Sequence, residues 1–281
     1  SRLSTIEEGI ALYEHEWLHG ISSSFELRGR HISSNRYVPM ILPDGRSLHG
    51  INDASIRIGL RLSKDETIVR MPFEVRHMGS KYPIFSFDFT GAKRGVLPAS
   101  YDYLRLEGRM QYRLNLPPIG YSQLMLEGGK IFGKVPYLLL KLHEGNGTYF
   151  YDRYAFSCMN FYEFSSDAWI SFFYEHHFNG FLLGRVPLLK KLNWREVFVF
   201  KGVYGTLSAR NDGSLPNTKA VMLFPVGMSS VEHPYLETGF GIENIFRLLR
   251  VDCIWRLTHH RAVPGLSIPT FTVNFSLNLK F

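Results

Sequence analysis

The last twelve residues of the sequence, TFTVNFSLNLKF (Thr270–Phe281), alternate without exception between polar and apolar side chains. Successive side chains of a β-strand point to opposite faces, so this stretch predicts a strand with one apolar and one polar face. The final residue is aromatic, although chain ends are usually polar and poorly ordered. A strand of a soluble sandwich would alternate in the same way. A membrane-spanning β-strand of about 9–11 residues accounts better for the length and the ending.

This stretch is also similar to the C-terminal signature of outer-membrane barrels, which the cellular assembly machinery reads. In that interpretation the apolar face of the strand is the recognised element. The residues expected to form the assembly signal are Phe275, Leu277, Leu279 and Phe281.

The composition of the 281 residues favours a β-barrel over the other classes of membrane or binding protein. No apolar run approaches 18 residues, so no transmembrane helix is expected. Aromatic residues make up 15% of the chain, as the aromatic girdles of a barrel require. The net charge of +7 comes from basic residues spread among the strands, which argues against nucleic acid and favours anionic lipid or a charged lumen. Two cysteines, Cys158 and Cys253, do not make a disulfide framework.

The same alternation recurs inside the chain, most clearly over Tyr103–Asn115, where both charge signs occupy one face. A sandwich would turn the polar faces outward and a barrel would turn them inward, and periodicity does not separate the two. The aromatic ending, the aromatic content and the regular strand length favour the barrel. The residues expected to face lipid are Leu104, Leu106, Met110, Leu114, Val251, Trp255, Phe271 and Phe275. The charged residues expected to face the lumen are Arg57, Arg61, Arg105, Glu107, Arg109, Arg113, Glu237, Glu243, Arg250, Asp252 and Arg256.

Together these patterns predict an all-β fold, a closed antiparallel transmembrane β-barrel of about twelve strands with a polar lumen. It forms a single domain over residues 1–281. The segment Asn179–Asn193 contains VPLLKKL, which we expect to lie at a membrane interface, and Asp212–Pro234 is expected to be a long loop. Further strands are expected in Ile6–Ile32 (two, broken near His19), Ser55–Ser63, Phe85–Thr90, Gln123–Ile131, Phe156–Phe164, Ala168–Phe178 and Arg195–Leu207.

Candidate catalytic and metal-binding groups have simpler explanations. His176 and His177 are neighbours on a predicted strand and point to opposite faces, so they do not chelate one ion together, and His259–His260 has the same defect. Asp167, Ser171 and His177 could form a hydrolase triad, but none lies in a nucleophile-elbow context. We therefore expect no enzyme activity, no metal and no cofactor.

The region Gly128–Leu257 resembles a family of Gram-negative outer-membrane proteins in which a carboxypeptidase-like regulatory domain precedes a C-terminal barrel. The strings that carry the resemblance are GGKIFGKVPYLLL (128–140), HEGNGTY (143–149), MNFYEFSSDAWIS (159–171), EHHFNGFLLGRVPLLKKLNWREV (175–197) and PYLETGFGIENIFRLLRVDCIWRLT (234–258). Cys158 and Cys253 depart from the residues expected there. The chain starts at Ser1, so the resemblance implies either the C-terminal part of a longer chain or a barrel-only relative. The final segments also resemble the barrels of outer-membrane assembly factors.

Three functions follow as hypotheses. The first is a non-enzymatic component or scaffold of an outer-membrane complex for protein biogenesis or nutrient uptake. The second is a narrow solute channel, and the third is an outer-membrane hydrolase. The expected location is the outer membrane of a Gram-negative-type envelope. The expected partners are outer-membrane lipid and lipopolysaccharide, the assembly machinery, and other outer-membrane or periplasmic proteins in a complex; no nucleic acid is expected.

Overall fold

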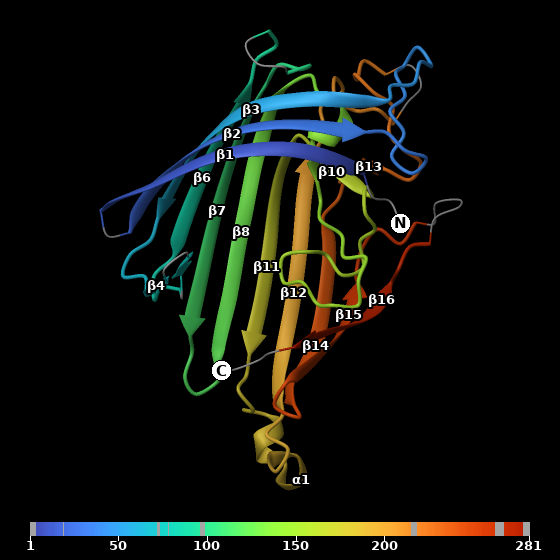
Figure 1. Ribbon diagram of the computed structural model, residues 1–281. Helices are drawn as coiled ribbons and strands as arrows, with labels where there is room; N and C mark the ends of the chain where they lie inside the picture. Colours follow the sequence, from blue (N-terminus) through green and yellow to red (C-terminus); the bar gives the residue numbers. More distant parts are fainter. Residues whose placement is uncertain are drawn as a thin grey trace.

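The computed structural model describes residues 4–18, 20–71, 74–77, 79–95, 99–214, 218–261 and 267–277. Its main feature is one antiparallel sheet of eleven strands in the order β1-β2-β3-β6-β7-β8-β11-β12-β14-β15-β16 (Figure 1). The strands of this sheet are β1 (Thr5–Leu18), β2 (Ile21–Ser33), β3 (Gly50–Leu62), β6 (Ile84–Ala92), β7 (Tyr103–Asn115), β8 (Tyr121–Gly133), β11 (Ala168–His177), β12 (Arg195–Thr206), β14 (Tyr235–Ile245), β15 (Leu249–Arg256) and β16 (Phe271–Leu277). The predicted all-β antiparallel fold is confirmed.

The two faces of the sheet are buried in the opposite sense to a soluble sheet. On β14 the side chain of Phe240 is 61% exposed, whereas Glu237, three residues earlier on the opposite face, is fully buried. On β15, Trp255 is exposed while its neighbours Ile254 and Arg256 are buried. On these two strands the alternating sequence therefore leaves large apolar side chains exposed on the open face and buries charges on the enclosed one.

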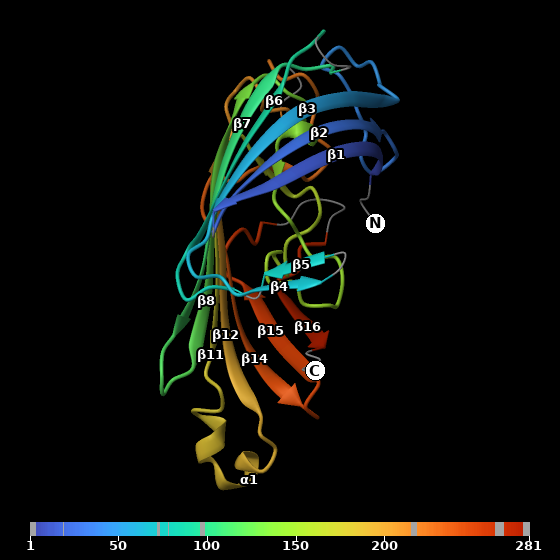
Figure 2. The same ribbon diagram turned by 60° about the vertical axis from the view of Figure 1, so that its left-hand side comes forward.

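The sheet curls strongly, so that β1–β3 at one edge and β14–β16 at the other lie on the same side of the central strands (Figure 2). Among the described residues no ladder joins β1 to β16. Each of the ten ladders between neighbouring strands is antiparallel, so β1 and β16 run in the same direction. The described sheet is thus open with eleven strands, where the sequence predicted closure and about twelve.

The connections differ between the two ends of the sheet. At one end, β1–β2, β7–β8 and β14–β15 are joined by residues 19–20, 116–120 and 246–248. The same end carries the hairpin of β4 (Ile68–Met71) and β5 (Glu74–His77), and the projecting turn with η2 (Leu183–Arg185) and α1 (Pro187–Lys190) (Figure 1). The other end carries long connections. No helix among the described residues is long and apolar enough to cross a membrane.

The connection between β8 and β11, residues 134–167, folds back into the space enclosed by the sheet and is called the inner segment below (Figures 1 and 2). It contains η1 (Tyr137–Leu139), β9 (Lys141–Leu142) and β10 (Phe164–Ser166). β9 and β10 form a small sheet with β13 (Ser229–Ser230). The predicted strand Phe156–Phe164 is therefore wrong, because this stretch belongs to the inner segment and its apolar side chains pack inside the curve.

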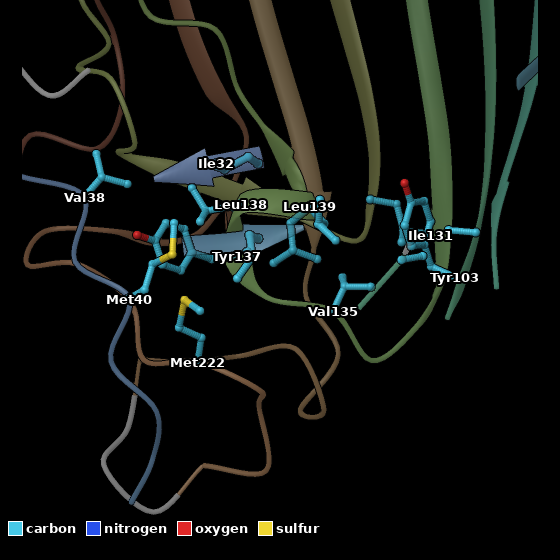
Figure 3. Close-up of a cluster of buried hydrophobic side chains, with 14 of the residues drawn as sticks. Ile32, Val38, Met40, Tyr103, Ile131, Val135, Tyr137, Leu138, Leu139 and Met222 are labelled. Carbon is cyan, nitrogen blue, oxygen red and sulfur yellow. The ribbon is translucent and has the colours of Figure 1, made fainter. Parts of the chain in front are cut away.

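A conventional apolar core lies at the end with the long connections (Figure 3). Tyr137, Leu138 and Leu139 of η1 pack there against Ile32 of β2 and Met222 of the β12–β14 connection. The Tyr137 hydroxyl donates a hydrogen bond of 2.9 Å to the carbonyl of Pro39. The core fixes the first part of the inner segment. The rest of the segment then lies against the charged face of β11–β15.

Candidate functional site

The enclosed face of β14 holds the inner segment through one carboxylate. Glu237 accepts the backbone N–H groups of Ser157 at 2.8 Å and Cys158 at 2.7 Å, and the Tyr235 hydroxyl at 2.7 Å. A fully buried carboxylate loses its hydration, and these three donors replace it. Through Glu237, the sheet thus binds the main chain of the inner segment and not a particular side chain.

Lys201 of β12 makes the complementary contact from the neighbouring strand. Its Nζ donates to the backbone carbonyls of Asp152 at 2.7 Å and Ala155 at 2.6 Å, and the residue is almost fully buried. The lysine therefore fixes carbonyl groups two to six residues before the N–H groups that Glu237 binds. Lys201 and Glu237 of the sheet together define the backbone path of residues 152–158.

Arg256 of β15 fixes the end of the same stretch. Its guanidinium donates to Glu163 Oε1 at 2.6 Å and to the Cys158 carbonyl at 3.2 Å. It also donates to the carbonyls of Thr258 at 3.0 Å and His259 at 2.6 Å. A planar guanidinium has five donors in a fixed fork, which suits this set of acceptors around one buried group.

A second charged cluster lies on the same face, around Glu175 of β11, which is 1% exposed. Arg250 of β15 donates to Glu175 at 3.2 Å and to Asp252 at 2.8 Å. Arg153 of the inner segment donates to the other Glu175 oxygen at 2.9 Å, and Tyr151 also donates to Glu175. Burial, with the nearby carboxylate, raises the pKa of Tyr151 well above its ordinary value, so the phenol keeps the proton that it donates.

Near its two ends the inner segment is held by polar contacts. Lys141 donates to Glu127 of β8 at 2.7 Å, and Arg109 of β7 pairs with the same carboxylate at 2.6 Å. The buried His143 ring lies 2.9 Å from the Ser166 hydroxyl. Burial lowers the pKa of His143 to about 3, so the ring is neutral at physiological pH. A cavity of about 290 Å³ remains between this region and β7, β8 and β11.

The arginines predicted to face the lumen on the first strands make contacts outside the inner segment. Arg57 pairs with Glu26 at 2.5 Å, Arg61 with Glu66 at 2.7 Å and Arg105 with Glu107 at 2.7 Å, while the Arg113 guanidinium lies 4.1 Å from the Tyr121 ring centroid. A cavity of about 630 Å³, lined in part by Arg57, Arg61 and Asp88, lies beside β1, β2, β3 and β6. The enclosed space therefore has one side filled by the inner segment and one side that is open.

The residues suspected of catalysis or metal binding are not brought together. His176 contacts Ser122 at 2.8 Å, whereas His177 contacts Glu243 at 3.2 Å and Glu175 at 3.4 Å. Asp167 accepts hydrogen bonds from Ser208 and Asn211, so it does not orient His177. Within the described residues, no group of three or more His, Cys, Asp or Glu side chains is placed to hold a metal ion.

Sequence reasoning did not single out Lys201 or Glu163, although they carry the contacts above, and it considered Glu175 only as a metal ligand beside His176 and His177, a role that it rejected. The predicted lipid-facing residues lie on the open face of the sheet, each partly or well exposed. Cys158 is buried, and this burial raises the pKa of its thiol to about 12, which makes it unreactive. Of the predicted assembly signal, Phe275 and Leu277 lie in β16, and Leu279 and Phe281 lie outside the described residues.

A single curled antiparallel sheet, apolar on its open face and charged on its enclosed face, defines a β-barrel-like fold of the outer-membrane type. The chain belongs to a family of unknown function (DUF5686): the C-terminal domain of that family matches residues 13–209. This match gives no evidence for the carboxypeptidase-like regulatory domain family that the sequence was expected to belong to.

Among solved structures, the fold is similar to that of BamA from Haemophilus ducreyi lacking POTRA domains 1–3. The TM-score is 0.58 at 10% sequence identity, over 98% of this chain and 55% of that chain. The chain thus spans about half the length of that structure, and the likeness shows the fold alone. No curated protein matches the chain.

Proposed function

We propose that this chain is an integral outer-membrane β-barrel protein of a Gram-negative-type envelope, whose interior is partly filled by its own inner segment. Its role is that of a non-enzymatic component or scaffold of an outer-membrane complex for protein biogenesis or nutrient uptake. Lipid and lipopolysaccharide contact the open face, and the barrel-assembly machinery inserts the chain. The likeness of the fold to BamA supports the barrel and its outer-membrane location.

The inverted burial of the sheet carries the proposal. Apolar surface left in water costs about 25 cal/mol per Å², and soluble monomers seldom expose continuous apolar patches of more than a few hundred Å². Here the open face carries Phe240, Trp255, Phe89, Ile58 and Ile170, all exposed and contributed by five different strands. Hydrocarbon removes this cost, and it tolerates sheets when their edges are satisfied.

Fractionation tests the membrane assignment. The chain is expressed behind a secretory signal in a Gram-negative host, and the membranes are separated on a sucrose gradient. We expect the protein in the outer-membrane fraction, with an electrophoretic mobility in SDS that changes on boiling. A monodisperse monomer obtained without detergent would overturn the assignment.

Conductance tests whether the inner segment closes the interior. Leu142 of β9 pairs with Ser165 of β10, so the residues between them can be replaced by a short turn without separating the two strands. Replacing Glu144–Glu163 by Gly-Ser-Gly-Ser should raise single-channel conductance in planar bilayers well above that of the unaltered protein.

The second candidate is a narrow solute channel, favoured by the cavity of about 630 Å³ beside Arg57, Arg61 and Arg109. Equal conductance with and without residues 144–163 would support this candidate over a closed scaffold. A screen of lipid and peptide substrates tests the hydrolase hypothesis, for which we expect no turnover.

A further inference from the structure

Three residues of the inner segment pair with β16 as a strand would. The Phe275 N–H donates to the Tyr149 carbonyl at 2.8 Å, and the Tyr151 N–H donates to the Phe275 carbonyl at 2.7 Å. Together these two bonds form a parallel bridge between Phe150 and Phe275. Beside it, the Asn274 side-chain amide donates to the Thr148 carbonyl at 3.2 Å.

The bridge lies on the edge of β16 that faces away from the sheet. The other edge of β16 is paired with β15 along Phe271–Leu277. Residues 149–151 therefore occupy the position where the next strand of the wall would lie. An unpaired strand edge is a template for pairing with other chains, and proteins commonly cover such edges.

Phe150 and Tyr151 point in opposite directions, as neighbouring side chains of a strand do, while Tyr149 is also exposed. Phe150 is 68% exposed, next to the exposed Phe275. The following residue, Tyr151, turns inward to Glu175, and its ring centroid lies 4.4 Å from the Arg250 guanidinium and 4.5 Å from Lys201 Nζ. The inner segment thus adds to the wall at this point as well as filling the interior.

The inner segment also contacts the opposite edge of the sheet. The Tyr162 hydroxyl lies 3.0 Å from the hydroxyl of Ser4, the residue directly before β1. Residues 149–162 therefore reach from the last strand to the start of the first one, across the gap where no ladder is described.

We propose that the inner segment is a latch across the gap between β1 and β16. It takes the place of a further sheet strand beside β16 and links the two edges of the sheet. Because Tyr151 is fixed by Glu175, Arg250 and Lys201, the charged cluster on the enclosed face controls whether the edge of β16 is covered. The edge of β16 is therefore covered only while the inner segment occupies the interior of the sheet.

Disulfide trapping tests the pairing. In a Cys158→Ala, Cys253→Ala background, Phe150→Cys and Phe275→Cys place two thiols directly opposite each other. Neighbouring strands are about 4.8 Å apart, within the Cα range of disulfides. The matched control, Phe150→Cys with Val273→Cys, moves one thiol two residues along the same face of β16. Mild oxidation of the folded protein in detergent should cross-link the first pair at least about fivefold faster than the control, measured by peptide mass spectrometry. Equal rates would overturn the latch.

A second comparison tests the coupling to the charged cluster. In the Phe150→Cys, Phe275→Cys chain, Glu175→Gln should slow cross-linking severalfold, because it weakens the contacts to Tyr151. Glu26→Gln, a change of a buried ion-paired glutamate on β2 that does not contact the inner segment, should leave the rate unaltered. Tyr151→Phe is the milder variant should Glu175→Gln fail to fold, as judged by the mobility change on boiling. Equal rates in all variants would overturn the coupling. Both readouts require only folded protein in detergent, so they fail or succeed independently of the membrane location and of conductance.

Discussion

Glu237 and Cys158 are 79 residues apart in the chain, and a 2.7 Å hydrogen bond joins the carboxylate of the first to the backbone N–H of the second. This buried carboxylate is thus satisfied by main-chain donors and a tyrosine hydroxyl. This arrangement ties the position of the inner segment to a single side chain of β14.

Glu237→Gln should loosen the inner segment. The amide group replaces one acceptor oxygen with an NH₂ that faces a backbone N–H donor, and a lost buried hydrogen bond of this kind costs about 1–3 kcal/mol. We expect proteolytic cleavage within residues 144–163 to become about tenfold faster in folded protein. Glu107→Gln is the control, because its partner is Arg105 of the same strand. Equal cleavage rates in the two variants would show that Glu237 does not hold the segment.

Arginine substitutions on β7 should distinguish the two faces of the sheet. Leu106 is paired with Phe89 on the open face, and Gln111 lies on the enclosed face. An arginine facing lipid near the bilayer midplane costs about 2–4 kcal/mol, and much less when it faces a polar interior. Leu106→Arg should therefore lower the free energy of unfolding from lipid vesicles by an amount of this order, and Gln111→Arg should change it little. Equal losses would contradict the assignment of the faces.

His143 should make stability depend on pH. Its pKa is lowered by burial to about 3, against about 6.5 in an unfolded chain. Between these values the unfolded state binds more protons, so the contribution is complete above pH 6.5 and is lost as the pH falls toward 3. The upper limit is about 1.4 kcal/mol per pH unit.

Guanidinium unfolding in detergent at pH 7.5, 6.0 and 5.0 measures this dependence. His143→Gln should flatten the loss of stability below pH 6.5, whereas substitution of the exposed His31 by Gln should not. A parallel pH dependence in the unaltered protein and the His143 variant would refute the assignment.

Local alternation accounts for how much of the fold could be predicted. Tyr103–Asn115 was predicted from its pattern and coincides with β7, because a strand between two wall neighbours has one apolar and one polar face along its whole length. Phe156–Phe164 lacks strict alternation. Phe156, Met159 and Phe164 instead fill a buried cluster with Phe173 and Tyr235. Their content of apolar side chains resembles that of a strand, but their partners are set by the long-range path of the chain.

The candidate site could be predicted in part for the same reason. Alternation places Glu237 and Arg256 on a polar face, but it does not reveal that their partners include the backbone of Ser157 and Cys158 and the carboxylate of Glu163. Lys201 lies in a strand rich in Val and Phe, where one lysine carries little pattern of its own. The geometry arises when the inner segment packs onto β12, β14 and β15. These segments are far apart in the sequence, so no local pattern reveals their contacts.

The shared direction of β1 and β16 has a mechanical consequence. A cylinder rolled from these eleven strands would be joined by one parallel line of contact in an otherwise antiparallel wall. Parallel pairing is slightly less stable per residue, and its hydrogen bonds are slanted instead of perpendicular. Tyr149–Tyr151 already meets β16 in this parallel sense. Under lateral tension, such a sheet would separate first between β1 and β16, before any of its antiparallel strand pairs.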